Sequence, residues 1–402
     1  MTAGWVRVAV LLLIGIPSAA RADDAPFGNR DTMWRSEHYI GALRHMGEIY
    51  FARPVKRGDT ASELPQGEAI DSLTYRHDGK DIPIEDYFSR ARSTGLIVLK
   101  DGKVVYERYL LAADRNSLFT SWSMAKSFTS TLVGFAIGDG LIKSVDDPID
   151  QYVPGLKGSG FEGVPIKAVL QMSSGVDFVE DYDRPESDIN TLWAATIQYN
   201  TKPVTEFLSH ARPGKPPFST FNYSGLDTSA LGWLVSSVTR KPLADYLSEK
   251  LWVPLGMQAD ANWNLDGDGG GANEIAYCCL NATLRDYARF GQFLLNGGNW
   301  NGRQLLPAGW VAEATHPDRP QVMPGKLHEG WTLGYQYQWW VFPDGSDSIG
   351  GFTAQGINGQ FLYVNPKERL VIIATNAWRE FWDDDLEREI YDIFAAFQAK
   401  LR

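Results

Sequence analysis

Two pairs of strand-like segments near opposite ends of the chain set the strongest limit on its fold. Residues 94–109 contain GLIVLK and VVYERYL around Asp101-Gly102, a dipeptide typical of a tight hairpin turn. Residues 360–376, QFLYVNPKERLVIIATN, repeat the pattern around Asn365-Pro366-Lys367. Because the chain between them is mostly helical in character, we expect an antiparallel sheet flanked by helices, with an inserted all-helical lobe. The predicted class is α/β, of the α+β type.

Further elements follow from local patterns. The segment YQYQWWVF at 335–342 predicts a third strand, and a helix is expected around Glu37 to Phe51. A helix after Ser123 should end at Gly138-Asp139-Gly140. Residues 383–401 predict an amphipathic helix, because apolar side chains recur on one face at Leu386, Ile390, Ile393, Phe394 and Phe397.

Residues 1–22 have the three parts of a secretory signal peptide. Arg7 supplies the positive charge, residues 8–16 the apolar run, and Ala20-Arg21-Ala22 the cleavage signal. The apolar run is too short to be a stable membrane anchor. We therefore expect an exported protein, periplasmic or secreted, in which residues 23–90 form an N-terminal extension packed on a main domain at 91–402.

The net charge of -11 argues against nucleic acid as a partner. The expected partner is a small-molecule substrate, and the chain is expected to be a monomer or a homodimer.

The two cysteines, Cys278 and Cys279, are adjacent, whereas exported proteins stabilised by disulfides carry more cysteines, spread apart. We expect a buried, reduced pair, because neighbouring cysteines bridge only through a strained ring.

Ser123 and Lys126 lie three residues apart at a predicted helix start, in SWSMAKSF. One helical turn places such residues on the same face, so the lysine amine can reach the serine hydroxyl. A base in that position makes the hydroxyl a nucleophile that forms acyl-enzymes. The helix N-terminus also favours the negative charge of a tetrahedral intermediate. About one Ser-x-x-Lys is expected by chance in a chain of this length. The motif therefore indicates catalysis only if other segments supply further catalytic groups.

Two later segments offer such partners. Tyr223, in FNYSG, precedes an apolar helix, where its hydroxyl can relay a proton to a leaving group. A tyrosine standing alone there would more often be a core residue bonded to backbone. The run GINGQ at 356–360 enters a predicted strand, and its small residues let the backbone approach a ligand closely. The amide of Gln360 can then be the second oxyanion donor.

In this order, the three segments resemble the motifs of the serine β-lactamase and penicillin-binding protein superfamily, which are Ser-x-x-Lys, Tyr-x-Asn and Lys-Thr-Gly or their variants. The class C-like branch is closest, with its esterases, D-aminopeptidases and 6-aminohexanoate-dimer (nylon oligomer) hydrolases. YVPGLKGSGFEG, DFVEDYDRPES and GINGQFLYVNP match the nylon oligomer hydrolases. The resemblance runs from about residue 90 to the C-terminus, and it implies a β-lactamase-like fold.

The resemblance implies a role for each matched residue. Ser123 would be the acylated nucleophile, Lys126 the base and Tyr223 the proton relay. The backbone amides of Ser123 and Gln360 would form the oxyanion hole. Gly225 departs from the pattern, because Asn or Ser usually stands two residues after the tyrosine, so one side-chain hydrogen bond is missing.

Tyr182, Asn358 and Gly359 are the substrate-binding candidates that the resemblance implies. Tyr182 matches a tyrosine that touches the scissile amide in nylon oligomer hydrolases, although a surface-loop aromatic is an equal alternative. Asn358 stands where those enzymes carry His, and Ile357-Asn358-Gly359 replaces Lys-Thr-Gly. This motif supplies no cation for a substrate carboxylate, which argues against penicillin binding and β-lactamase activity.

We therefore expect a serine hydrolase for amide or ester bonds, with linear amides of the 6-aminohexanoate-oligomer type as the best substrate. A short-chain carboxylesterase and a D-amino-acid peptidase are alternatives, and a sensor or binding module on the same fold is the non-enzymatic one. A Ser-His-Asp hydrolase of the α/β type is disfavoured, because the chain lacks its Gly-x-Ser-x-Gly elbow. The six histidines show no metal-ligand spacing, so neither metal nor cofactor is expected.

Overall fold

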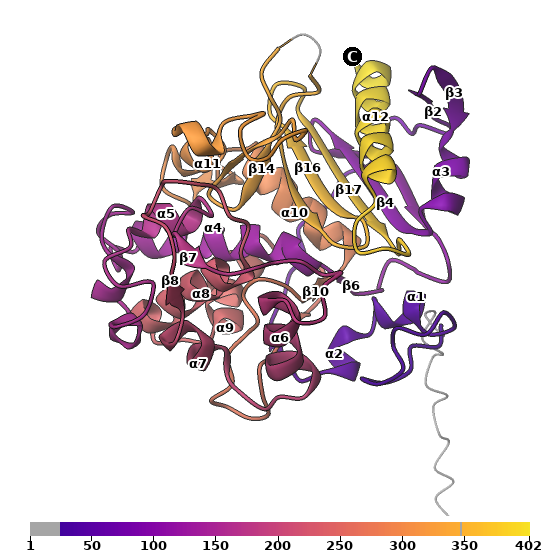
Figure 1. Ribbon diagram of the computed structural model, residues 1–402. Helices are drawn as coiled ribbons and strands as arrows, with labels where there is room; N and C mark the ends of the chain where they lie inside the picture. The colour runs from indigo at the N-terminus through magenta and orange to yellow at the C-terminus, as the bar shows by residue number, and fades with distance from the viewer. Residues whose placement is uncertain (1–24, 346–347) are drawn as a thin grey trace, which may run out of the picture.

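The computed structural model describes residues 25–345 and 348–402, so the predicted signal peptide at 1–22 lies outside the described residues. A seven-stranded antiparallel sheet, in the order β13-β14-β15-β16-β17-β4-β5, forms its centre (Figure 1). The first predicted hairpin is β4 (Ser93–Lys100) and β5 (Lys103–Tyr109), and the second is β16 (Gln360–Asn365) and β17 (Leu370–Asn376). Strand β17 pairs with β4, so the two ends of the chain meet in one sheet, which confirms the prediction.

Each face of this sheet carries its own apolar core. Alternate residues of a strand point to opposite faces. In β4, Ile97 and Leu99 belong to the core that includes α10 (Leu284–Leu295), while Leu96 and Val98 belong to the core that includes α12 (Asp384–Leu401). The C-terminal amphipathic helix is thus present as predicted, and it covers one face while α10 covers the other.

The middle of the chain forms a mostly helical lobe beside the sheet (Figure 1). Its centre is α4 (Ala125–Gly138) packed on α8 (Gly225–Thr239). A short strand pair, β7 (Val176–Asp177) with β8 (Arg212–Pro213), makes the lobe mostly rather than wholly helical. The other elements of the lobe are η2 (Ile149–Gln151), η3 (Pro154–Leu156), α5 (Ile166–Leu170), α6 (Asp188–Trp193), η4 (Ala194–Gln198), α7 (Val204–Ser209), α9 (Leu243–Leu247) and η5 (Ser248–Trp252).

A second, four-stranded sheet ties the N-terminal segment to the rest. Its order is β1 (Ala52–Val55), β9 (Ala261–Asn264), β10 (Leu280–Ala282) and β6 (Phe119–Thr120). Strand β6 ends three residues before Ser123, so this sheet also fixes the approach to the candidate nucleophile. The remaining elements are α1 (Tyr39–Ala42), α2 (Met46–Ile49), β2 (Thr74–His77), β3 (Lys80–Pro83), α3 (Ile84–Arg90), β11 (Asn299–Trp300), β12 (Arg303–Gln304), α11 (Trp310–Ala314), η6 (Pro320–Val322) and β15 (Phe352–Gly356).

The segment 335–342 is not one strand, and that prediction is wrong. It forms a hairpin of β13 (Gly334–Gln336) and β14 (Trp339–Val341), and Tyr337 and Gln338 at the turn have φ values of 36° and 68°. Tight hairpins need such left-handed residues, usually Asn or Gly, and here the sequence carries neither. Tertiary bonds hold the turn instead, since the Gln338 amide nitrogen donates to Leu170 O at 3.0 Å and the Tyr337 hydroxyl to Glu313 at 2.7 Å.

Two further predictions need correction. The helix expected around Glu37 to Phe51 is two short helices, α1 and α2, separated by Leu43 to His45. Cys278 and Cys279 are joined by a disulfide, so the expectation of a reduced pair is wrong. The backbone makes this bridge between neighbours accessible, because Cys279 takes the left-handed conformation with a φ of 69°. Among the described helices, none combines the length and the apolar character that crossing a membrane requires.

Candidate active site

Ser123 and Lys126 meet at the start of α4. Ser123 lies in the 3-10 turn η1 (Trp122–Met124), which leads directly into the helix, and Lys126 lies in its first turn. The lysine Nζ donates a hydrogen bond to Ser123 Oγ at 3.0 Å. Lys126 is 1% exposed and Ser123 8% exposed, so the amine is held on the hydroxyl and shielded from solvent. This arrangement suits proton transfer from serine to lysine.

The turn that presents Ser123 is strained and held by aromatic rings. Trp122, the residue before it, has a φ of 42°, a conformation that costs energy in a bulky residue and tends to occur at functional sites. The Trp122 ring stacks on Trp34 with centroids 6.0 Å apart and contacts Trp193 at 5.6 Å. Trp34 comes from the N-terminal segment, which therefore helps to position the candidate nucleophile Ser123.

Glu180 is a buried carboxylate beside Lys126 that the sequence analysis missed. Its side chain is 3% exposed, and Oε1 lies 3.7 Å from Lys126 Nζ. It accepts the Gly225 backbone N–H at 2.5 Å and the Tyr182 hydroxyl at 2.6 Å. A Cβ at Gly225 would lie 3.2 Å from Glu180 Oε2, so the carboxylate fills the space where the expected Asn or Ser would begin. The Glu180 side chain, from another segment of the chain, thus takes the place of the side chain that Gly225 lacks.

Tyr223 lies at the N-terminus of α8, as predicted, directly before the capping residue Ser224. Its ring lies beside the Ser123–Lys126 pair, with its centre 4.5 Å from Lys126 Nζ. Burial raises the pKa of the phenol and nearby Glu180 adds to this, whereas Lys126 and Ser123 act to lower it. Trp340 stacks on the ring with centroids 5.5 Å apart, which restricts the orientation of the tyrosine.

The end of the β15–β16 hairpin lies against the backbone of the nucleophile turn. A Cβ at Gly356 would lie 2.5 Å from Ser121 O and 3.1 Å from Ser123 N, so only glycine allows this approach. Gln360 is the register partner of Gly356, which brings its backbone to the same end of the sheet. Its side chain is committed elsewhere, since Nε2 donates to Asn358 O and Asn376 O. The Gln360 side chain is thus engaged away from Ser123, and the role of its backbone amide as an oxyanion donor stays a prediction.

Asn358 and Gly359 form the turn between β15 and β16, with φ values of 58° and 84°. Asn358 is 1% exposed, and its side-chain amide donates to the carbonyls of Trp378 at 3.3 Å and Glu380 at 3.1 Å. A Cβ at Gly359 would lie 2.4 Å from the Trp378 ring. The side chain of Asn358 is therefore bonded to the backbone of Trp378 and Glu380, and substrate binding by Asn358 and Gly359 stays a prediction.

Tyr182 belongs to the group around Ser123 rather than to a distant surface loop. Its hydroxyl bonds to Glu180, and its ring lies 5.5 Å from that of Phe381. Phe381 in turn contacts Trp34 at 6.0 Å. Aromatic rings from three separate segments therefore meet next to the candidate catalytic residues.

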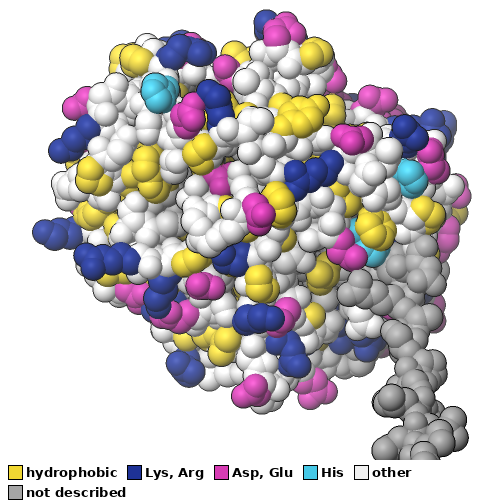
Figure 2. Space-filling view, turned by 90° about the horizontal axis from the view of Figure 1, so that it is seen from below, with side chains coloured by type: hydrophobic (Ala, Val, Ile, Leu, Met, Phe, Trp, Pro, Cys, Tyr) yellow, Lys and Arg dark blue, Asp and Glu magenta, His cyan; other side chains and the backbone are white. Residues whose placement is uncertain are grey.

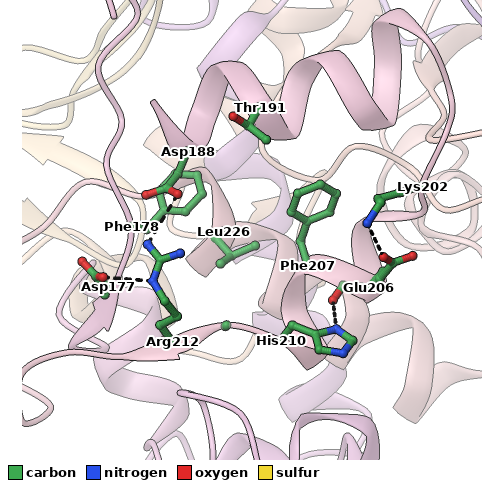
Figure 3. A pocket seen from close by; sticks show the side chains of 11 residues that line it. Asp177, Phe178, Asp188, Thr191, Lys202, Glu206, Phe207, His210, Arg212 and Leu226 are labelled. Atoms are coloured by element: carbon green, nitrogen blue, oxygen red, sulfur yellow. Dashed lines mark hydrogen bonds and ion pairs between the residues drawn. The ribbon is translucent and has the colours of Figure 1, made fainter. Parts of the chain in front are cut away.

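A cavity of about 310 Å³ lies in the helical lobe, between α6, α7 and the start of α8 (Figure 3). Its apolar part is made by Phe178, Phe207 and Leu226. Its charged residues pair with one another, as in the 3.1 Å contact of Arg212 with Asp177. Ser123, Lys126 and Tyr223 are not among its lining residues, so it is separate from the candidate active site.

On the face seen in Figure 2, basic and acidic side chains are interspersed.

The chain is similar in sequence to a known protein family and to a characterised hydrolase. A family model described as Beta-lactamase matches residues 84–394. The chain is 28% identical to the 6-aminohexanoate-dimer hydrolase of Paenarthrobacter ureafaciens over 359 residues, which covers 87% of this chain and 88% of the relative.

Solved structures extend these likenesses. One from Bacillus anthracis, provisionally named a 6-aminohexanoate-dimer hydrolase, superposes with a TM-score of 0.80 at 25% identity and covers 92% of this chain and 97% of that one. A class C beta-lactamase has a TM-score of 0.54 at 17% identity, covering 78% and 93% of the two chains, and so shares the fold.

Proposed function

The chain belongs to the Beta-lactamase family and is a hydrolase of that superfamily, and from this premise we propose that it cleaves amide or ester bonds through a serine acyl-enzyme. One observation carries the proposal. Lys126 Nζ lies 3.0 Å from Ser123 Oγ in a buried setting, which is the geometry that nucleophilic catalysis by serine needs. Tyr223 lies beside this pair, with its ring centre 4.5 Å from Lys126 Nζ, and completes the group.

In the proposed acylation, Ser123 Oγ attacks the substrate carbonyl carbon while Lys126 Nζ takes the hydroxyl proton. The resulting oxyanion accepts hydrogen bonds from the backbone amides of Ser123 and Gln360. The carbon–nitrogen or carbon–oxygen bond then breaks, and the leaving group takes a proton through the Tyr223 hydroxyl. Water attacks the acyl-enzyme in the second half, gives its proton to the same relay, and releases the acid and free Ser123.

Linear amides of the 6-aminohexanoate-oligomer type are the proposed substrates. The name of the Paenarthrobacter relative supports this class. The third motif carries Ile357-Asn358-Gly359 and supplies no cation for a carboxylate, and the buried Glu180 carboxylate adds a negative charge near the nucleophile. Both features disfavour an anionic group next to the scissile bond. Short-chain esters would be cleaved by the same residues.

A panel of substrates compared in wild type and Ser123→Ala tests this function. The panel consists of aminohexanoate dimer, p-nitrophenyl butyrate, D-alanyl p-nitroanilide and a chromogenic cephalosporin. We expect hydrolysis of the dimer and the ester, cephalosporin turnover well below both, and no activity above background in Ser123→Ala. Cephalosporin turnover faster than that of the ester would contradict the argument from Asn358, and an active Ser123→Ala protein would contradict the mechanism.

Export is inferred from the signal-like residues 1–22 alone. Expression of the full chain in a Gram-negative host, followed by fractionation and N-terminal sequencing, tests it. We expect periplasmic or secreted protein that begins at or near Asp23. Cytoplasmic protein that retains residues 1–22 would contradict export without affecting the catalytic proposal.

A further inference from the structure

His77, Asp78 and Asp385 form a cluster away from the candidate active site, and we propose that they bind a zinc-like divalent metal ion. His77 Nε2 lies 3.8 Å from Asp78 Oδ2 and 3.7 Å from Asp385 Oδ1. The three ligand atoms all lie within 4.8 Å of one another. His77 ends β2 and Asp385 lies in the first turn of α12, and these two elements pack side by side (Figure 1).

The imidazole of His77 is held as metal-bound histidines are held. Its Nδ1 lies 2.8 Å from a carboxylate oxygen of Asp392. A carboxylate only accepts hydrogen bonds, so it selects the tautomer with hydrogen on Nδ1 and directs the lone pair of Nε2 toward Asp78 and Asp385. Metal-ligating histidines commonly have this carboxylate partner on the other nitrogen.

The free nitrogen of His77 is an independent sign of a ligand. The residue is 8% exposed, and within the described part of the chain its Nε2 is buried without a hydrogen-bond partner. An unpaired buried polar atom is unfavourable, and most such atoms in native proteins do have a partner. A bound cation would supply the missing interaction at the point where two carboxylates also converge.

The donor set favours zinc over calcium or magnesium. One imidazole nitrogen and two carboxylate oxygens, with water as the fourth ligand, suit Zn²⁺, whose ligand atoms lie roughly 3.3 to 3.5 Å apart. Calcium and magnesium prefer oxygen ligands alone. Asp78 and Asp385 are 75% and 61% exposed, so their carboxylates are free to move by the small distance required. Arg388 pairs with Asp385 and would have to release the shared oxygen.

Metal binding would join the β2–β3 hairpin near the N-terminus to the C-terminal helix α12. A ligand that binds only the folded state stabilises it in proportion to its concentration over its Kd. The metal would therefore act on stability, and the rate of hydrolysis at Ser123 should not depend on it. The spacing of histidines in the sequence misses such a site, because its ligands come from opposite ends of the chain.

Zinc titration of untagged, chelator-treated protein tests the proposal. Isothermal titration should give one Zn²⁺ per chain, and the thermal midpoint should rise with Zn²⁺ but not with Ca²⁺ or Mg²⁺. Asp385→Asn should weaken Zn²⁺ binding by roughly tenfold or more. The matched control is Asp384→Asn, which removes the same charge from the neighbouring exposed residue and should keep wild-type affinity.

A second probe reports on the ligands directly. Co²⁺ in place of Zn²⁺ should give the visible absorption of a four-coordinate site in wild type and Asp384→Asn, and lose it in His77→Gln. Absence of saturable binding, or equal affinity in Asp385→Asn and Asp384→Asn, would overturn the proposal. In that case His77 would be a charged imidazolium paired with its three carboxylates.

Discussion

Glu180 stands in for the side chain that Gly225 lacks. Its Oε2 accepts the Gly225 N–H at 2.5 Å, and a Cβ at residue 225 would lie 3.2 Å from that oxygen. Its Oε1 accepts the Tyr182 hydroxyl and lies 3.7 Å from Lys126 Nζ. The polar side chain next to the candidate catalytic residues therefore comes from residue 180 rather than from residue 225.

The first prediction concerns the space that Glu180 occupies and that a side chain at residue 225 would also need. Gly225→Asn should destabilise the protein by about 1 to 3 kcal/mol, because its side chain would crowd Glu180 and Tyr277. Adding Glu180→Ala should relieve part of that cost, which urea unfolding of both single variants and the double variant measures as a coupling free energy. Additive effects would show that the two positions do not share the space.

The second prediction concerns the proton relay. Tyr223→Phe keeps the ring that stacks on Trp340 and removes the hydroxyl, so folding should be unaffected while kcat falls by roughly 10² to 10⁴. Tyr199→Phe is the matched control, since Tyr199 is 66% exposed, and it should keep wild-type kcat. Equal activity in the two variants, measured on p-nitrophenyl butyrate, would remove Tyr223 from the mechanism.

The third prediction concerns Asp227, whose burial raises the pKa of its carboxyl to about 8. The Ser174 hydroxyl donates a hydrogen bond to this carboxyl at 2.7 Å. The unfolded chain releases this proton near pH 4 and the folded chain near pH 8, so the free energy of unfolding should fall as pH rises between these values, by up to ~1.4 kcal/mol per pH unit.

Asp227→Asn mimics the protonated acid, so this variant should not show the decrease in the free energy of unfolding that Asp227 causes as pH rises. Its stability relative to wild type should therefore grow from pH 5 to pH 8 and change little at pH values above the folded pKa. Chemical unfolding of both proteins across that pH range measures the difference. A difference that is constant with pH would show that Asp227 is ionised in the folded protein.

The fourth prediction concerns the disulfide between Cys278 and Cys279. Protein purified without reductant and unfolded in guanidinium should show no free thiol by a colorimetric thiol assay, and two after reduction. The bridge closes almost no loop, so its reduction should change the thermal midpoint little compared with disulfides that span long loops. Two free thiols before reduction would contradict the bridge.

Local patterns were enough to predict the sheet and the first pair of site residues. The turn at Asp101-Gly102 and the spacing of Ser123 and Lys126 depend only on neighbours in sequence, and the structure contains both features. The hairpin at Tyr337 and Gln338 could not be predicted in this way, because contacts with Leu170 and Glu313 hold its turn.

The unpredicted parts of the site depend on contacts between distant segments. Glu180 reaches Lys126 and Gly225 from the matched segment DFVEDYDRPES, in which only Tyr182 was a candidate, although the glycine at 225 was a sign that another group fills the space. His77 meets Asp385 only because the two ends of the chain pack together. Cys279 shows the same limit, since its left-handed backbone, which allows the bridge, has no local signal.

The most direct test of the account is intact-protein mass spectrometry after treatment with a fluorophosphonate. The folded protein should gain the mass of one adduct, and peptide mapping should place it on Ser123. Ser123→Ala should gain none, and Lys126→Met should react at least roughly a hundredfold more slowly, because the hydroxyl loses its base. An unmodified wild-type protein, or an adduct that persists in Ser123→Ala, would contradict catalysis by Ser123.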